Sequence, residues 1–318
     1  MQPTAQEKRV AIALPLGPVT RPGWFWRIVQ FPIARIFILL VASGLGQALI
    51  SGLFGQLRLG DENPLGALAI SGAVIAMTVL VYVLFVRWIE RRSATELALK
   101  QASRELGIGA LLGFAAITAT VFLMWLAGAY RVVGTHSALA MVAALTIGLV
   151  PAFTEEILFR GILYRIVEGS LGTWAALITT SLLFGVSHLA NPNASWFAAF
   201  AIAIEAGLLL GAAYTVTQRL WISIGLHFAW NWAQGGVYGV PVSGISVNGL
   251  LDAQVEGPAL LAGGGFGAEA TIFAIAVCVA IFALMMVRVY RTDQLILPFW
   301  QRKRLLAAQT HAAPVAAA

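Results

Sequence analysis

Residues 67–86 read ALAISGAVIAMTVLVYVLFV, a run of twenty residues without a charged side chain. An α-helix of about this length crosses the roughly 30 Å hydrocarbon core of a bilayer. Backbone polar groups in lipid must be satisfied within each segment, so the sequence predicts an all-α, polytopic membrane bundle of about eight transmembrane helices. Similar apolar runs place the expected spans at about 33–54, 67–88, 107–130, 138–165, 173–190, 196–216, 220–237 and 269–290.

The composition of the whole chain supports a membrane protein. Of the 318 residues, 59% are hydrophobic and 11% are charged, whereas a soluble protein carries roughly 25% charged residues. The single cysteine, Cys278, excludes an intrachain disulfide and a Cys-based metal site. The net charge of +6 comes from basic residues that border the spans, so we expect the lipid bilayer and not nucleic acid as a partner.

The basic residues divide unequally between the two sides of the predicted membrane. Arg160 lies inside a span, seventeen of the other Lys and Arg residues fall on one side, and only Arg58 and Arg131 fall on the other. This asymmetry predicts a multi-pass protein of the inner or plasma membrane, expected in a prokaryote, with both termini in the cytoplasm. The expected organisation is a cytoplasmic segment at 1–30 without a cleavable signal, one transmembrane domain at 31–292 and a disordered cytoplasmic tail at 293–318.

Ionisable residues inside the expected spans require an explanation, because each costs at least about 2.5–3.5 kcal/mol at the centre of a membrane helix. They are Glu155, Glu156, Arg160, His188, Glu205 and His227. Glu156 and Arg160 are four residues apart with the acid first, so they can pair on one helix face. Glu155 points about 100° away around the helix and remains without an equivalent partner. A structural cluster that joins helices is the alternative interpretation of these three charges.

Two histidines on later spans complete a set of residues suited to hydrolysis. Phe184 and His188 are one helical turn apart, as are His227 and Asn231. A glutamate and a histidine can activate water as general bases, and a histidine and an asparagine can donate hydrogen bonds to an oxyanion.

The same set of residues also allows metal chemistry. Glu155, His188 and His227 can supply three ligands to a catalytic Zn²⁺ and leave one position for water. By residue counting, His188 lies nearer the extracytoplasmic end than His227. A kink, a tilt or a late helix start must therefore bring the two rings together.

Three short motifs follow one another on successive spans: Glu155-Glu156-x3-Arg160, Phe184-x3-His188 and His227-x3-Asn231. Together with Phe159 and Gly161, they resemble the CAAX protease and bacteriocin-processing (CPBP, or Abi) family, which includes the type II CAAX prenyl endopeptidases. The resemblance covers about residues 87–270. It implies an eight-helix intramembrane endopeptidase whose substrate is a membrane-attached peptide or protein, including prenylated CAAX-like ones.

The resemblance also implies a role for each motif residue. Glu155 and His188 correspond to the pair that activates water, and His227 and Asn231 correspond to the groups that stabilise the oxyanion. Glu156 and Arg160 correspond to positioning groups, and Phe184 belongs to the second motif. A zinc-dependent and a metal-free glutamate mechanism both agree with this pattern.

Other protease classes fit the sequence less well. None of the four histidines is followed by Glu, which excludes an HExxH zinc site. The three aspartates lie in loops or tails, which excludes an intramembrane aspartyl pair. A Ser–His pair built on Ser243 would leave the Glu155, Glu156 and Arg160 cluster without a role. A non-catalytic membrane scaffold is the main alternative function, and a proton-coupled transporter is a second.

Two further features remain open from the sequence. Glu205 stands outside the three motifs and is expected either to line a cavity or to make a polar contact peculiar to this chain. The 238–268 stretch is long, rich in glycine and free of Lys and Arg. It is expected either to form a lid or re-entrant element or to serve as a mobile linker.

Overall fold

The computed structural model describes residues 23–56 and 64–312 and leaves 1–22, 57–63 and 313–318 outside the described part. The α-helices and the two strands of the described residues, in chain order, are α2 (Trp24–Val29), α3 (Pro32–Gln56), α4 (Pro64–Trp88), α5 (Ala102–Leu126), β1 (Tyr130–Thr135), α6 (Leu139–Ala143), α7 (Leu145–Glu156), α8 (Arg165–Leu171), α9 (Thr173–Ser187), α10 (Trp196–Ile202), α11 (Leu209–Thr217), α12 (Trp221–Trp232), β2 (Leu251–Val255), α13 (Ala259–Ala262), α14 (Ile272–Arg291) and α15 (Phe299–Ala312).

Short helical segments extend several of these elements. Three are π-helical, namely η3 (Ile157–Tyr164), η5 (Ala203–Leu208) and η6 (Ala233–Val237). Four are 3₁₀ turns, namely η1 (Thr95–Leu97), η2 (Leu99–Gln101), η4 (His188–Ala190) and η7 (Ala268–Ala270). They join their neighbours into long continuous rods, such as Leu139–Leu171 and Trp196–Thr217.

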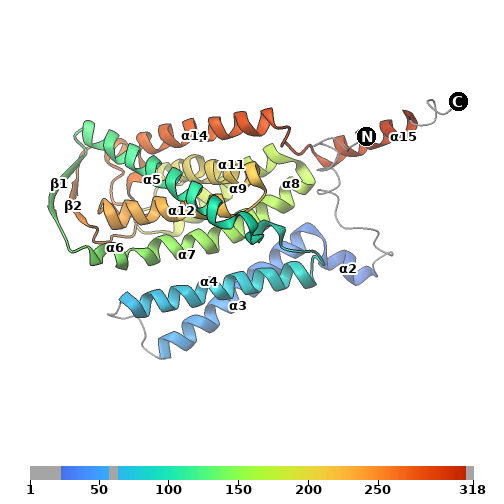
Figure 1. The fold of residues 1–318 in the computed structure, drawn as a ribbon, viewed down its shortest axis with the longest axis horizontal. Coiled ribbons are helices and arrows are strands. Elements are labelled where there is room, and N and C mark those ends of the chain that lie inside the picture. Colours follow the sequence, from blue (N-terminus) through green and yellow to red (C-terminus); the bar gives the residue numbers. More distant parts are fainter. Residues whose placement is uncertain (1–22, 57–63, 313–318) are drawn as a thin grey trace.

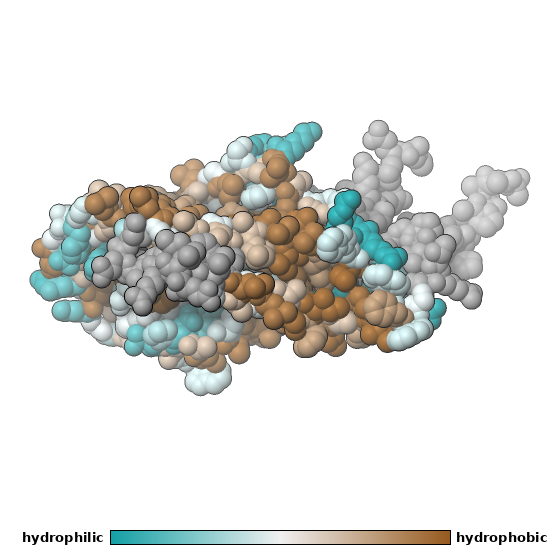
Figure 2. Space-filling model, turned by 90° about the horizontal axis from the view of Figure 1, so that it is seen from below, coloured by the Kyte–Doolittle hydropathy of each residue, from teal (hydrophilic) through white to brown (hydrophobic). Residues whose placement is uncertain are grey.

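The polytopic helical fold predicted from the sequence is confirmed. Six helical rods of the described residues are long and apolar enough to cross a membrane. The other two expected spans correspond to α3, of which Pro32–Gly46 is a shorter apolar stretch, and to the continuous helix formed by α12 and η6. Eight is therefore an approximate number of spans. Figure 2 shows hydrophobic residues over the middle of one face and hydrophilic residues toward its two ends, as expected for a bilayer-facing surface.

The rods surround a central unit made of α10, η5 and α11. In Trp196–Thr217, 67% of the most apolar window is buried, compared with 22% in α14 at the periphery. Figure 1 shows α5, α7, α9, α11, α12 and α14 as one bundle, with α3 and α4 paired along its outer side. α2 and α15 lie at one end of this bundle, and β1 and β2 lie at the other.

Glycines allow α5 and α12 to approach closely. A Cβ atom on Gly109 or Gly113 would lie 2.2 Å from the carbonyl oxygen of Ile222 or Leu226, respectively. From the other side, a Cβ atom on Gly225 would lie 2.4 Å from the Leu106 carbonyl oxygen. Small residues commonly permit such backbone contact between membrane helices. This contact fixes the position of α12, the helix that carries His227 and Asn231.

A buried ionic network fastens the end of the bundle near α2. The Glu90 carboxylate, which is 2% exposed, pairs with Arg35 at 3.3 Å, Arg92 at 2.8 Å and Arg165 at 2.7 Å. Burial raises the pKa of Glu90, but Arg165, Arg92 and Arg35 together outweigh burial and hold this pKa below its ordinary value. The network joins α3, the 88–95 connection and α8, and so anchors the rod that carries the two motif glutamates.

The 238–268 stretch packs onto the bundle, which supports the lid or re-entrant interpretation over a mobile linker. Its strand β2 pairs antiparallel with β1, and Val240, Val242 and Phe266 are buried. Phe266 belongs to the same apolar cluster as Phe159 and Phe184 of the motif helices.

The C-terminal segment differs from the disorder that the sequence predicts. Phe299–Ala312 forms the helix α15, and Arg302 of this helix is buried and donates a hydrogen bond to the Gly169 carbonyl. This contact supplies a tertiary partner that composition alone does not reveal. The expectation for residues 313–318, and that for most of the 1–30 segment, falls outside the described residues.

Candidate active site

Three π-helical segments surround the predicted catalytic residues. The segment η3 begins directly after Glu156, η5 contains Glu205, and η6 follows the helix that carries His227 and Asn231. A π-helical turn takes up an extra residue and rotates the side chains that follow, and such turns are frequent at functional sites. The helix geometry is thus irregular where the motifs lie.

The predicted pair between Glu156 and Arg160 forms, and it is fully buried. Arg160 Nη1 donates to Glu156 Oε1 at 2.7 Å, and Nη2 donates to the carbonyl oxygens of Ala206 at 3.0 Å and Gly207 at 3.1 Å. The guanidinium carbon lies 4.7 Å from the centre of the Phe184 ring, a cation–π contact. Arg160 therefore connects the Glu156 helix to η5 and α9.

The His227 imidazole faces both motif glutamates. Its Nδ1 lies 3.0 Å from Glu156 Oε1, and its Nε2 lies 4.0 Å from Glu155 Oε2. Because a carboxylate only accepts, Nδ1 carries the proton in this pair. The Glu155 side chain is 30% exposed, yet its Oε2 is buried and makes no hydrogen bond in the described structure. A buried carboxylate oxygen without a donor is unusual, and Glu156 Oε2 is a second one in this cluster.

His188 lies where α9 ends and turns into η4. Its Nδ1 is 2.8 Å from the carbonyl oxygen of Phe184, so Nδ1 donates and the neutral ring keeps a free lone pair on Nε2. The Phe184 ring centre lies 4.7 Å from that of His188 and 6.3 Å from that of His227. The structure therefore brings the two histidines to one place despite their different positions along the helices.

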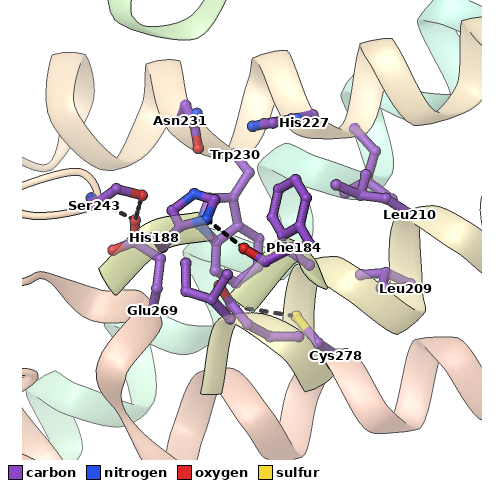
Figure 3. A pocket seen from close by; sticks show the side chains of 14 residues that line it. Phe184, His188, Leu209, Leu210, His227, Trp230, Asn231, Ser243, Glu269 and Cys278 are labelled. Carbon is purple, nitrogen blue, oxygen red and sulfur yellow. Dashed lines mark hydrogen bonds between the residues drawn. The ribbon is translucent and has the colours of Figure 1, made fainter. Parts of the chain in front are cut away.

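A small cavity lies between these side chains. Figure 3 shows His227 and Asn231 projecting from α12 on one side, His188 and Phe184 in the middle, and Cys278 on the far side. The lining residues are Phe184, His188, Ile202, Glu205, Ala206, Leu209, Leu210, Leu226, His227, Trp230, Asn231, Ser243, Glu269 and Cys278. Glu155 is not one of them. It faces His227 at 4.0 Å from the adjacent helix, without a hydrogen bond.

The structure adds a second acidic residue that the motifs do not include. Glu269 Oε1 accepts hydrogen bonds from the Ser243 backbone N–H at 2.7 Å and from the Ser243 hydroxyl at 3.0 Å. Its Oε2 accepts one from Gln234, which in turn accepts one from Trp230 at 2.8 Å. Burial raises the pKa of Glu269, although the hydrogen bonds from Gln234 and Ser243 act in the opposite direction.

These contacts fasten the 238–268 loop over the cavity. The backbone N–H of Gly244 also donates to the Phe266 carbonyl at 2.7 Å, and Asn191 donates to the Ser243 carbonyl at 3.1 Å. The one sequence signal for Glu269 is its position beside the glycine-rich run, at the start of the last expected span. The hydroxyl of Ser243 is engaged by a carboxylate, which is not the partner that a Ser–His pair requires.

The predicted zinc ligands Glu155, His188 and His227 offer the donor atoms that zinc prefers. Within the part of the chain that the structure describes, no three His, Cys, Asp or Glu side chains are grouped closely enough to hold a metal ion. As arranged, these three residues therefore do not form a ligand set.

Comparison with protein families gives one finding. Residues 136–233 match the family model described as type II CAAX prenyl endopeptidase Rce1-like. Comparisons with curated proteins and with solved structures give no match. The matched segment contains all three motifs and both glutamates that face His227. Over residues 136–233 the chain is thus similar to the Rce1-like type II CAAX prenyl endopeptidases, and the family resemblance drawn from its motifs is confirmed.

Proposed function

We propose that this protein is an intramembrane endopeptidase that hydrolyses a peptide bond of a membrane-attached peptide or protein. The observation that carries the proposal is the Glu155 carboxylate, whose buried oxygen has no hydrogen-bond donor and faces His227 at 4.0 Å. The neighbouring Glu156 is neutralised by Arg160, whereas Glu155 is not. An unpaired carboxylate beside an imidazole inside a membrane bundle is expensive and is therefore a functional group by default.

Glu155 is suited to act as the general base. A separation of 4.0 Å between Glu155 Oε2 and His227 Nε2 is short for two waters and can be bridged by one. Glu155 takes a proton from this water as the water oxygen attacks the peptide carbonyl carbon. It then gives the proton to the leaving nitrogen, so that the C–N bond breaks into a carboxylic acid and an amine. The free Nε2 of His188 accepts a hydrogen bond from the same water and orients it.

His227 and Asn231 are suited to stabilise the oxyanion. Both lie on the same face of α12 and line the cavity. The Asn231 amide donates directly, and His227 donates from Nε2 when that nitrogen carries a proton. Glu156 accepts from Nδ1 at 3.0 Å, which fixes the ring orientation. Glu156 and Arg160 are thus positioning residues.

Two observations support a membrane-attached substrate. The cavity lies among rods with the length and composition of membrane spans, and the matched family is described as a prenyl endopeptidase. A lipid anchor would hold a peptide at the depth of the site. The protease itself would then need no affinity for water-soluble peptides. Zinc remains a prediction, for which metal analysis of the purified protein is the direct measurement.

The test is cleavage of a quenched fluorescent peptide library, lipidated and unlipidated, by the protein in liposomes. Glu155→Gln and His188→Ala are each expected to lower kcat about 10²–10⁴-fold, the usual contribution of a general base. Glu256→Gln, which removes an exposed carboxylate of the 238–268 loop, should leave kcat unchanged. Cleavage at the wild-type rate by both site variants would contradict the mechanism and favour a membrane scaffold.

A further inference from the structure

The Glu205 carboxyl group lines the cavity without a charged partner. Its side chain is 2% exposed and lies on η5, in the same cavity as His188 and His227. Its one hydrogen bond in the described structure comes from the Cys278 thiol, with Sγ 4.0 Å from Oε2. A thiol is a weak donor. A buried carboxyl inside a membrane bundle normally has a stronger partner, which leaves a place for a donor from outside the chain.

The walls beside Glu205 are apolar. They consist of Ile202, Ala206, Leu209, Leu210, Leu226 and Trp230. None of the fourteen described residues that line the cavity is Lys or Arg. Apolar walls beside an acid are complementary to a side chain with an aliphatic stem and a cationic end. The Trp230 ring adds a surface that attracts cations.

The orientation of the cavity separates Glu205 from the reacting groups. Figure 3 shows Cys278, on α14, on the side of the cavity opposite His227 and Asn231 of α12. Glu205 Oε2 lies 4.0 Å from the Cys278 Sγ atom. A peptide whose carbonyl faces α12 can therefore direct a neighbouring side chain toward Glu205.

Glu269 lines the same cavity but is not itself free. Both of its oxygens already accept hydrogen bonds from Ser243 and Gln234. Glu269 therefore holds the loop, and Glu205 is the carboxyl available to a ligand.

We propose that Glu205 forms a specificity subsite for a cationic side chain, Lys or Arg, of the substrate peptide. The inference rests on the proposed peptidase function, because it places the cation next to the bond that the site hydrolyses. The ammonium or guanidinium group pairs with the Glu205 carboxylate, and the methylene groups contact Leu209 and Leu210. Substrates with an uncharged side chain of equal length bind the same walls but leave Glu205 unpaired.

The first arm of the test measures cleavage. Each pair of lipidated peptides has Lys in one member and norleucine in the other at the same position. A separate pair is made for every position near the scissile bond. At one position the wild type is expected to prefer Lys about 100-fold or more in kcat/KM, since a site built around a polar group discriminates strongly against analogues that lack its partner. Glu205→Gln should abolish this preference while it keeps cleavage of the norleucine peptide. Glu256→Gln should keep the preference.

The second arm measures binding without catalysis. Fluorescence anisotropy of labelled Lys and norleucine peptides is compared for Glu155→Gln and for the Glu155→Gln/Glu205→Gln double variant in nanodiscs. Tighter binding of the Lys peptide by the single variant, lost in the double variant, supports the subsite even if no peptide is cleaved. Cleavage or binding with no Glu205-dependent preference at any position overturns the subsite and leaves the peptidase proposal intact. Equal melting temperatures of the variants show that folding does not account for the difference.

Discussion

Arg160→Met provides a test of how the site is held together. Arg160 donates one hydrogen bond to the Glu156 carboxylate and two to backbone carbonyls of η5, and it is 1% exposed. A hydrogen bond to a charged group contributes about 1.5–3 kcal/mol, and a neutral one about 0.5–1.5 kcal/mol. The substitution also leaves Glu156 buried without its countercharge. We therefore expect a loss of about 3–5 kcal/mol in the free energy of unfolding, as for other broken buried pairs.

The double variant Glu156→Gln/Arg160→Met separates the charge effect from packing. It removes both charges, so it should be more stable than Arg160→Met by about 2 kcal/mol, although one more residue is changed. The assay is unfolding by a denaturing detergent in mixed micelles, followed by circular dichroism. The matched control is Arg219→Met. Arg219 pairs with Glu105, but its side chain is 31% exposed, and such pairs contribute at most about 1 kcal/mol. Equal losses for Arg160→Met and Arg219→Met would refute the reasoning.

Three further predictions follow from other parts of the structure. Gly113→Leu should separate α5 from α12 and lower the melting temperature and the activity together, because a Cβ atom at this position would lie 2.2 Å from a backbone oxygen. The control Gly107→Leu places its side chain in open space and should change neither. His227→Gln should lower kcat about 10²–10³-fold with little change in melting temperature, measured with the peptide that the wild type cleaves. The pKa of Glu90 is below its ordinary value of 4.5 in the folded protein. The ionised Glu90 therefore stabilises the fold fully above pH 4.5, and this stabilisation is lost as the pH falls through the pKa of the folded state. Unfolding measured at several pH values should show this dependence in the wild type and not in Glu90→Gln.

The sequence predicted the features that depend on local patterns. Apolar runs of about 20 residues are sufficient to place membrane helices, because a bilayer imposes length and hydrophobicity on each helix separately. The four-residue spacing of Glu156 and Arg160 was enough to predict their ion pair, since both lie on one helix face. The same spacing left Glu155 without that arginine, which agrees with its unpaired oxygen in the structure.

Features that depend on the packing of distant segments could not be read from the sequence. Glu155 faces His227, 72 positions later, because α7 and α12 lie together in the bundle. The π-helical turns change the side-chain directions that residue counting at 3.6 per turn assumes. Glu269 enters the cavity through a loop whose path depends on hydrogen bonds to Gln234 and Ser243.

The adjacent residues Glu155 and Glu156 show why burial alone does not assign function. Both are carboxylates on one membrane helix, and both carry the same cost of removal from water. Arg160 and His227 offset that cost for one oxygen of Glu156, although its Oε2, like the Oε2 of Glu155, is buried without a hydrogen-bond partner in the described structure. The two residues differ in charge and access, because Arg160 pairs with Glu156 and not with Glu155, and the Glu155 side chain is 30% exposed whereas that of Glu156 is fully buried. We therefore propose Glu155, and not Glu156, as the group that performs the chemistry.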